Sequence, residues 1–164
     1  MSLRKVLVTD TNIWIDLDNG EILKEVFLLP YQFLTPDLAV PELISPDWET
    51  LHALGLESQG LDSASMQDLL TIRQVHKSLS VVDLASYLLA KVSDLSLVTG
   101  DRHLSDFAQS QGLTVHGVLW ILDEIVETRV LASNLVAESL MKIINLGARL
   151  PKEECRKRLE RWSN

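Results

Sequence analysis

Four carboxylates hold most of the chemistry that this sequence offers. Asp10 directly follows a short apolar run, and Asp101 comes shortly after another. Asp83 stands in the first turn of a predicted helix, and Glu42 lies in the segment just after a predicted strand. In open α/β sheets, ligand sites form outside the carboxyl ends of the strands. The four side chains are therefore candidates for one shared site.

A shared site of this kind would bind a divalent cation. Carboxylates that are brought together repel one another, and the repulsion either shifts their pKa values or recruits a cation. Mg²⁺ and Mn²⁺ prefer such hard oxygen ligands. Two such ions about 4 Å apart can activate a water molecule and stabilise the leaving oxygen of a phosphodiester. The four acids thus have the chemistry that phosphodiester hydrolysis requires.

Each acid also has a purely structural explanation. Asp10 and Asp101 precede predicted helices, where Asp is a favoured N-cap residue. Ser80 and Asp83 have the spacing of a capping box, and Glu42 fits a solvated surface position. Taken singly, each acid is better explained in this way. Spacing alone does not show whether the four converge.

The elements that must position these acids alternate along the chain. Short apolar runs predict strands over residues 5–9, 31–35, 95–99 and 113–116, and a turn or short edge strand over 57–62. Helical periodicity and capping signals predict helices over residues 12–18, 21–28, 46–56, 63–77, 80–92, 101–111, 117–128, 131–145 and from 151 onward. This alternation predicts a three-layer α/β/α fold with a mostly parallel central sheet. We expect one domain over residues 1–164, with an α/β core over 4–128 and C-terminal helices over 129–164.

Composition sets further limits. No apolar stretch approaches the ~20 residues of a membrane helix, and Cys155 is the only cysteine, which excludes an internal disulfide and a thiolate zinc cluster. We therefore expect a cytoplasmic protein. The net charge is −8, which argues against a nucleic-acid partner. However, residues 149–164 hold six bases and three acids, so the charge is uneven. If RNA is the substrate, bound cations must offset part of the acidity.

Other catalytic classes lack their motifs. The four histidines have no His-x-x-x-His spacing, so zinc hydrolysis of that type is not indicated. The chain has no Gly-x-Ser-x-Gly elbow and no Walker or dinucleotide glycine pattern. The acids remain as the main candidates.

Four motifs around the acids resemble those of the PIN-domain family. Residues 6–12 resemble its opening strand and Asp-Thr-Asn signature, and residues 40–43 resemble its glutamate motif. Residues 80–85 resemble the Asp that opens an Ala- and Leu-rich helix, and residues 97–102 the strand followed by Thr-x-Asp. The order and intervals of the motifs are similar to those of the family, over roughly residues 4–118. The helical tail resembles a subfamily with a C-terminal helical extension.

The resemblance implies a metal-dependent endoribonuclease. On this basis Asp10, Glu42, Asp83 and Asp101 are the metal ligands and catalytic residues, and the cofactor is Mg²⁺ or Mn²⁺. Many members are toxins of prokaryotic toxin–antitoxin pairs, and many are homodimers blocked by a small antitoxin protein. We therefore expect an RNA substrate, an antitoxin partner and a homodimer, with no membrane association.

Four further residues are candidates for supporting roles. Asn12 and Thr99 match polar positions that can assist a ligand in the family. Arg102 is a candidate phosphate contact, although a solvated helix face is its simpler interpretation. Asp106, one helical turn beyond Arg102, is a candidate for a further acid near the metal, although a surface position explains it as well.

Two other functions are open alternatives. A phosphotransferase of the haloacid-dehalogenase type would use Asp10 as its nucleophile, but it needs a second Asp where this chain has Asn12. A catalytically weak or inactive PIN-like module, which binds a protein or RNA partner, is the other alternative. Retention of all four acids argues against a pure scaffold, because a scaffold has no reason to bear their repulsion.

Overall fold

The central feature of the fold is a five-stranded sheet in the order β3-β2-β1-β4-β5. The structure is a computed structural model that describes residues 4–163. The strands are β1 (Lys5–Thr9), β2 (Tyr31–Pro36), β3 (Glu57–Gln59), β4 (Ser96–Val98) and β5 (Val115–His116). Every pair of neighbouring strands is parallel. The predicted α/β class with its mostly parallel sheet is confirmed, and residues 57–59 form the short edge strand.

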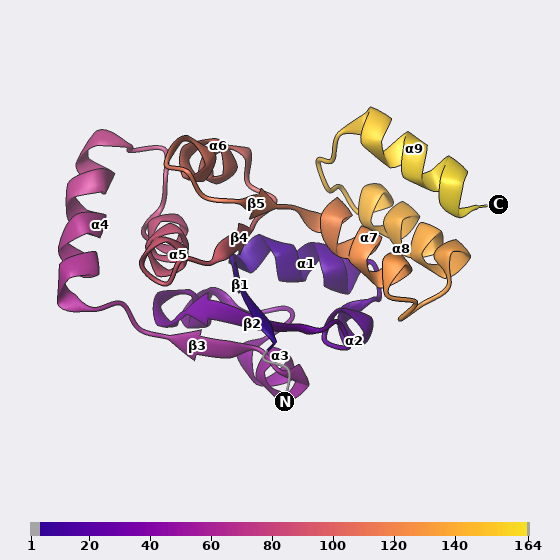
Figure 1. Cartoon of the computed structure of the whole chain (residues 1–164), viewed down its shortest axis with the longest axis horizontal. Coiled ribbons are helices and arrows are strands. Elements are labelled where there is room, and N and C mark those ends of the chain that lie inside the picture. Colours follow the sequence, from indigo (N-terminus) through magenta and orange to yellow (C-terminus); the bar gives the residue numbers. More distant parts are fainter. Residues whose placement is uncertain (1–3, 164) are drawn as a thin grey trace.

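Helices connect the strands and cover the sheet (Figure 1). They are α1 (Thr11–Asn19), α2 (Leu23–Val26), the 3₁₀ helix η1 (Asp37–Glu42), α3 (Trp48–Leu54), α4 (Ser63–Val75), α5 (Val81–Val92), α6 (Arg102–Ser110), α7 (Val118–Glu127), α8 (Ser133–Asn145) and α9 (Lys152–Trp162). No helix within residues 4–163 combines the length and the apolar character that a bilayer-spanning segment needs.

Alternating side chains of the strands supply two cores, one on each face of the sheet. In β1, Leu7 packs with residues of α1, α7 and α8, whereas its neighbour Val8 packs with residues of α5 and α6. Phe33 and Leu34 of β2 divide in the same way. Successive residues of a strand point to opposite faces, and a parallel sheet is normally covered on both. The result is the predicted three-layer α/β/α arrangement (Figure 1).

The last two helices pack on the face that carries α1 and α7. Cys155 and Trp162 of α9 are buried in the same core as Leu7. The Arg158 guanidinium also donates two hydrogen bonds to Asp123 of α7, from Nε to Oδ1 at 2.8 Å and from Nη2 to Oδ2 at 2.7 Å. This paired geometry holds α9 against the α/β body.

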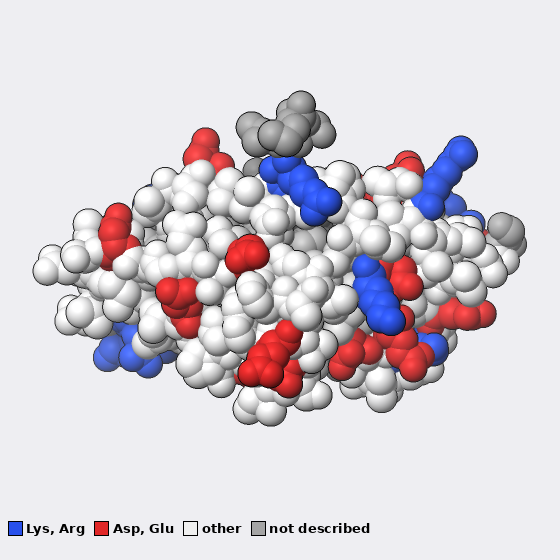
Figure 2. Space-filling model, turned by 90° about the horizontal axis from the view of Figure 1, so that it is seen from below, with Lys and Arg blue, Asp and Glu red and all other residues white. Residues whose placement is uncertain are grey.

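Acidic side chains are spread over the face of the molecule shown in Figure 2. The lysines and arginines drawn there are separate from one another and form no continuous basic patch. A nucleic-acid surface needs clustered bases that neutralise phosphates. This face therefore does not have the charge of a nucleic-acid surface.

Candidate metal centre and groove

Two of the predicted acids lie where the order of the sheet reverses. The chain runs from β1 through β2 to β3 on one side, and returns to β4 and β5 on the other. Asp10 follows β1 and Asp101 follows β4, its neighbour in the sheet. The Asp10 N–H donates to the Val98 carbonyl at 3.2 Å, which holds the two strand ends together. Such a switch point is where open α/β sheets bind ligands.

Asp10 is the most buried of the predicted acids, with 2% of its surface exposed. Its Oδ1 accepts a hydrogen bond from the Ile13 N–H at 3.2 Å, and its Oδ2 accepts one from the Thr99 hydroxyl. Burial raises the pKa of Asp10 from 3.8 to about 7, against the lowering effect of these hydrogen bonds. The charges of Asp83 and Asp101 make a smaller contribution to this rise, which the value of about 7 already includes. The site therefore opposes the negative charge of Asp10 when no cation is bound.

Thr99 links Asp10 to Asp101. Its hydroxyl donates to Asp10 and accepts a hydrogen bond from the Asp101 N–H at 3.0 Å. The side chain of Asp101 in turn accepts from the Leu104 N–H at 2.9 Å, as the N-cap of α6. One buried hydroxyl thus sets the relative positions of two acids.

Asp83 reaches the same site from α5. It forms the predicted capping box, in which the Asp83 N–H donates to Ser80 Oγ and the Ser80 N–H donates to Asp83 Oδ2, both at 3.0 Å. The side chain is half-buried, and its charge acts on Asp10. The predicted caps at Asp10, Asp83 and Asp101 are all confirmed. A capping role does not exclude an electrostatic one, because Asp83 and Asp101 cap helices and their charges also act on Asp10.

Glu42 and Asp106 lie further from this centre. Glu42 ends η1 and is exposed, and it is not among the charges that shift the pKa of Asp10. Glu42 belongs to η1, which packs against α5, the helix that carries Asp83. Asp106 is exposed and pairs with Arg102, whose Nε lies 3.9 Å from its Oδ2. Their roles at a metal stay predictions.

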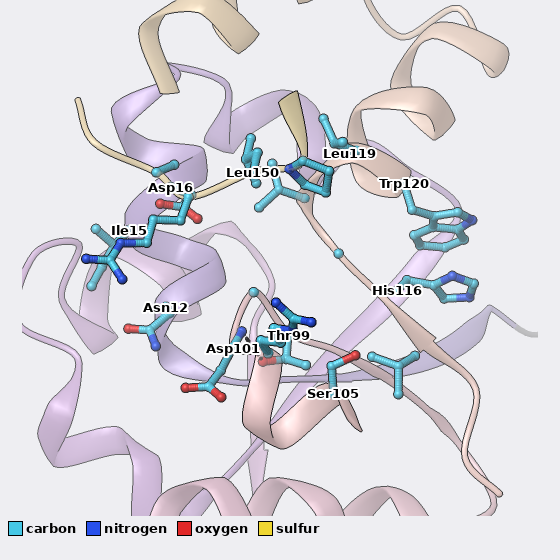
Figure 3. A pocket seen from close by; sticks show the side chains of 18 of the residues that line it. Asn12, Ile15, Asp16, Thr99, Asp101, Ser105, His116, Leu119, Trp120 and Leu150 are labelled. Atoms are coloured by element: carbon cyan, nitrogen blue, oxygen red, sulfur yellow. Dashed lines mark hydrogen bonds between the residues drawn. The ribbon is translucent and has the colours of Figure 1, made fainter. Parts of the chain in front are cut away.

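A groove of about 1200 Å³ runs beside Asp101, which is the predicted acid that lines it (Figure 3). Asn12 of α1 and Thr99, Asp101 and Arg102 of the β4–α6 turn line one part of it. Other parts of its wall are Ile15 and Asp16 of α1, residues 115–120 from β5 into α7, and residues 147–151 between α8 and α9. In Figure 3, Asp101 and Thr99 lie together at one end, with His116 and Trp120 to one side. Asn12, Thr99 and Arg102 thus border a space that can hold a ligand.

Asp16 is a further acid in this groove, and sequence reasoning missed it. It lies one helical turn after Asn12, on the same face of α1. A Cβ atom added to Gly100 would lie 3.8 Å from Asp16 Oδ2, so the Asp16 carboxylate lies next to the turn between β4 and α6. Burial raises the pKa of Asp16. The four-residue spacing from Asn12 is the signal that could have found it, because residues at that spacing share a helix face.

The oxygen donors of these residues are of the kind that Mg²⁺ prefers, but they do not form a complete metal site in advance. Within residues 4–163, no three His, Cys, Asp or Glu side chains are close enough together to form a ready ligand group. Mg²⁺ does not need such a group, since it usually keeps several waters and binds through one or two carboxylates and the substrate phosphates. Asp10 and Asp101, joined through Thr99, supply two carboxylates of this kind.

The parallel sheet, with Asp10 and Asp101 where its strand order reverses, defines an α/β protein with an acidic ligand site. Comparison with known proteins identifies the family. The family model described as PIN domain matches residues 6–164. The chain belongs to the PIN-domain family, whose members are generally nucleases and typically use divalent metals. The comparison with curated proteins found no match.

Two solved structures share the fold. One is the PilT N-terminus domain protein SSO1118 from the hyperthermophilic archaeon Sulfolobus solfataricus P2, with a TM-score of 0.53 and 14% identity over 74% of this chain and 94% of that chain. The other is PAE2754 from Pyrobaculum aerophilum, with a TM-score of 0.52 and 17% identity over 76% of this chain and 99% of that chain. Both matches cover nearly all of the archaeal chain, so this protein has additional length.

Proposed function

We propose that this protein is a divalent-metal-dependent endoribonuclease that hydrolyses RNA phosphodiester bonds, and that it acts as the toxin of a toxin–antitoxin pair. The observation that carries the proposal is the state of Asp10. Burial and two neighbouring acids oppose its charge, and Thr99 connects it to Asp101, which lines an open groove. Strongly shifted carboxylates in clefts are characteristic of functional sites. A bound cation would offset this unfavourable charge.

Asp10 and Asp101 would hold the ion, with Asp83 and Glu42 on the side of α5. Mg²⁺ or Mn²⁺ would supply positive charge that stabilises the phosphodiester oxygens and favours deprotonation of the attacking water. The clustered acids also explain how an acidic protein can bind RNA, since bound cations neutralise part of the charge that phosphates would otherwise meet.

The other residues of the site hold these carboxylates and the substrate in place. Thr99 and the Ile13 N–H each occupy one oxygen of Asp10, which fixes the plane of its carboxylate. Asn12 lines the groove with an exposed amide that can donate to a phosphate or a ribose hydroxyl. The Arg102 side chain is 93% exposed and has only a long ion pair, so it can turn toward a phosphate.

A cleavage assay tests the proposal. Fluorescent single-stranded RNA of mixed sequence would be incubated with the protein and Mn²⁺, and in parallel with EDTA. We expect cleavage only with the metal, and a loss of about a hundredfold or more in Asp101→Asn, because even the partners of metal ligands typically contribute about 10–100-fold. Asp68→Asn is the matched control, since Asp68 is exposed on α4 and lies outside the groove.

The toxin role is tested separately in cells. Induced expression of the unchanged protein in a bacterial host is expected to stop growth, whereas Asp101→Asn at equal abundance is not. If both proteins leave growth unaffected while the purified protein cleaves RNA, the nuclease assignment stands and the toxin role is wrong. If neither assay shows metal-dependent activity, the alternative of an inactive module that binds a partner takes its place.

A further inference from the structure

The C-terminal helices bring a new segment to the groove. We propose that residues 147–151, between α8 and α9, form the second wall of the RNA-binding groove, and that Arg149 contacts a backbone phosphate of the bound strand. This inference rests on the proposed function and adds a substrate contact to it.

The first argument is the position of the segment. Residues 147–151 line the same groove as Asp101 and Thr99, although they lie about a third of the chain away in sequence. Figure 3 shows Leu150 beside Asp16, with Asp101 and Thr99 further along the groove. A strand that passes the acids would therefore lie against this segment.

The second argument is that the segment is held at both ends. Gly147 follows α8 with φ = 102°, a left-handed conformation that favours glycine and turns the chain away from the helix. Pro151 is the N-cap residue of α9, and the paired Arg158–Asp123 hydrogen bonds tie α9 to α7. The wall is thus part of the folded body, which reduces the entropy lost when a ligand binds.

The third argument is charge. Arg149 is exposed and lines the groove, and it forms no ion pair with any residue in the part of the chain that the structure describes. Four other bases of the tail each lie within ion-pair distance of an acid: Arg156, Lys157, Arg158 and Arg161. Lys152 lies outside the groove. Among the lysines and arginines of residues 149–164, Arg149 is therefore the one placed to neutralise the negative charge of a ligand in the groove.

Two aromatic rings also line the groove. The rings of His116 and Trp120 are stacked, with centroids 3.9 Å apart and planes 12° apart, and both residues line the groove. Stacking of bases on aromatic side chains is a common mode of single-strand recognition. Phosphate-binding and stacking groups on the same groove favour RNA over an acidic peptide as its occupant.

The salt dependence of RNA binding tests the proposal. The full-length protein, with Ca²⁺ as the metal, would be titrated with a short fluorescein-labelled single-stranded RNA at several KCl concentrations, and Kd measured by fluorescence anisotropy. Loss of one phosphate contact lowers the slope of log Kd against log [KCl] by about 0.7 for single strands. We expect this change in Arg149→Gln, and recovery of the original slope in Arg149→Lys. Thermal unfolding of both variants would verify that they are folded.

Arg73→Gln is the matched control. Arg73 is an exposed arginine on α4, which Figure 1 shows at the far end of the molecule from α9. We expect this variant to keep the slope of the unchanged protein. If the unchanged protein binds and cleaves RNA but Arg149→Gln also keeps the slope, the second wall is wrong and the proposed function stands. If the unchanged protein neither binds nor cleaves RNA, both are wrong.

Discussion

Replacing Asp10 by asparagine is expected to change how the stability of the metal-free protein depends on pH. Asparagine has the shape of Asp10 and is an equally good N-cap, so the hydrogen bond from the Ile13 N–H is kept. It carries no charge, however. The variant therefore removes the one property of Asp10 that its surroundings oppose.

The size of the effect follows from the pKa of Asp10. It is 3.8 ordinarily and about 7 in the folded protein, a difference of about three units. Each unit corresponds to about 1.4 kcal/mol, so the total is about 4 kcal/mol. Because the folded-state pKa is raised, the protonated carboxyl contributes this stability fully below pH 3.8, and the contribution is lost as the pH rises through about 7.

Urea unfolding followed by tryptophan fluorescence measures this effect. Both proteins would be unfolded in EDTA at a series of pH values from about 4 to about 8.5, the range in which the contribution changes. The free energy of unfolding of the unchanged protein, relative to Asp10→Asn, is expected to fall by about 4 kcal/mol across the series. Any altered hydrogen bond to Thr99 adds an offset that does not depend on pH. Titrating groups other than Asp83 and Asp101, whose charges act on Asp10, are common to both proteins and cancel in the difference.

A difference that stays constant with pH would refute the reasoning. It would mean that Asp10 has an ordinary pKa in the folded protein, and hence that its charge does not need a cation. A difference of the opposite sign, with the unchanged protein gaining stability as the pH rises, would mean that hydrogen bonds outweigh burial at this site.

Two further changes test the hydrogen bonds around the site. Thr99→Val keeps the shape of the side chain but removes the hydroxyl that lowers the pKa of Asp10, so the midpoint of the pH dependence described above should move to higher pH. Arg158→Gln should lower the free energy of unfolding in urea by about 2 kcal/mol, because it breaks two mostly buried, charge-assisted hydrogen bonds to Asp123. Arg156→Gln, on the exposed side of the same helix, is the control and should cost less than about 1 kcal/mol.

The order and type of the elements were predictable because they depend on local patterns. A strand of a parallel sheet is buried on both faces, so β1 and β4 stand out as short apolar runs between polar segments. Helix starts were predictable for a similar reason. An N-cap such as Asp10, Asp62 or Asp101 accepts a hydrogen bond from an N–H three residues later, and only a few residue types can do so.

The arrangement of the site was less accessible, because it depends on contacts between distant residues. The hydrogen bond between Thr99 and Asp10 joins residues 89 positions apart, and nothing in the spacing of the acids gives the burial of Asp10. The position of residues 147–151 depends on the turn at Gly147 and on the pairing of Arg158 with Asp123, 35 positions away. Sequence patterns predicted Asn12, Thr99 and Asp101 as site residues but missed Asp16, and tertiary packing determined that all four line one groove.

Calorimetric titration with Mn²⁺ tests the central claim most directly, since it asks whether the carboxylates bind a cation without requiring the natural RNA. It would be done above about pH 7.5, where protons no longer compete for Asp10. We predict saturable binding by the unchanged protein, marked weakening in Asp10→Asn and Asp101→Asn, and no change in Asp68→Asn, a control on the exposed face of α4. Absence of binding, or binding that Asp10→Asn and Asp101→Asn leave intact, would contradict the assignment and leave these acids as helix caps alone.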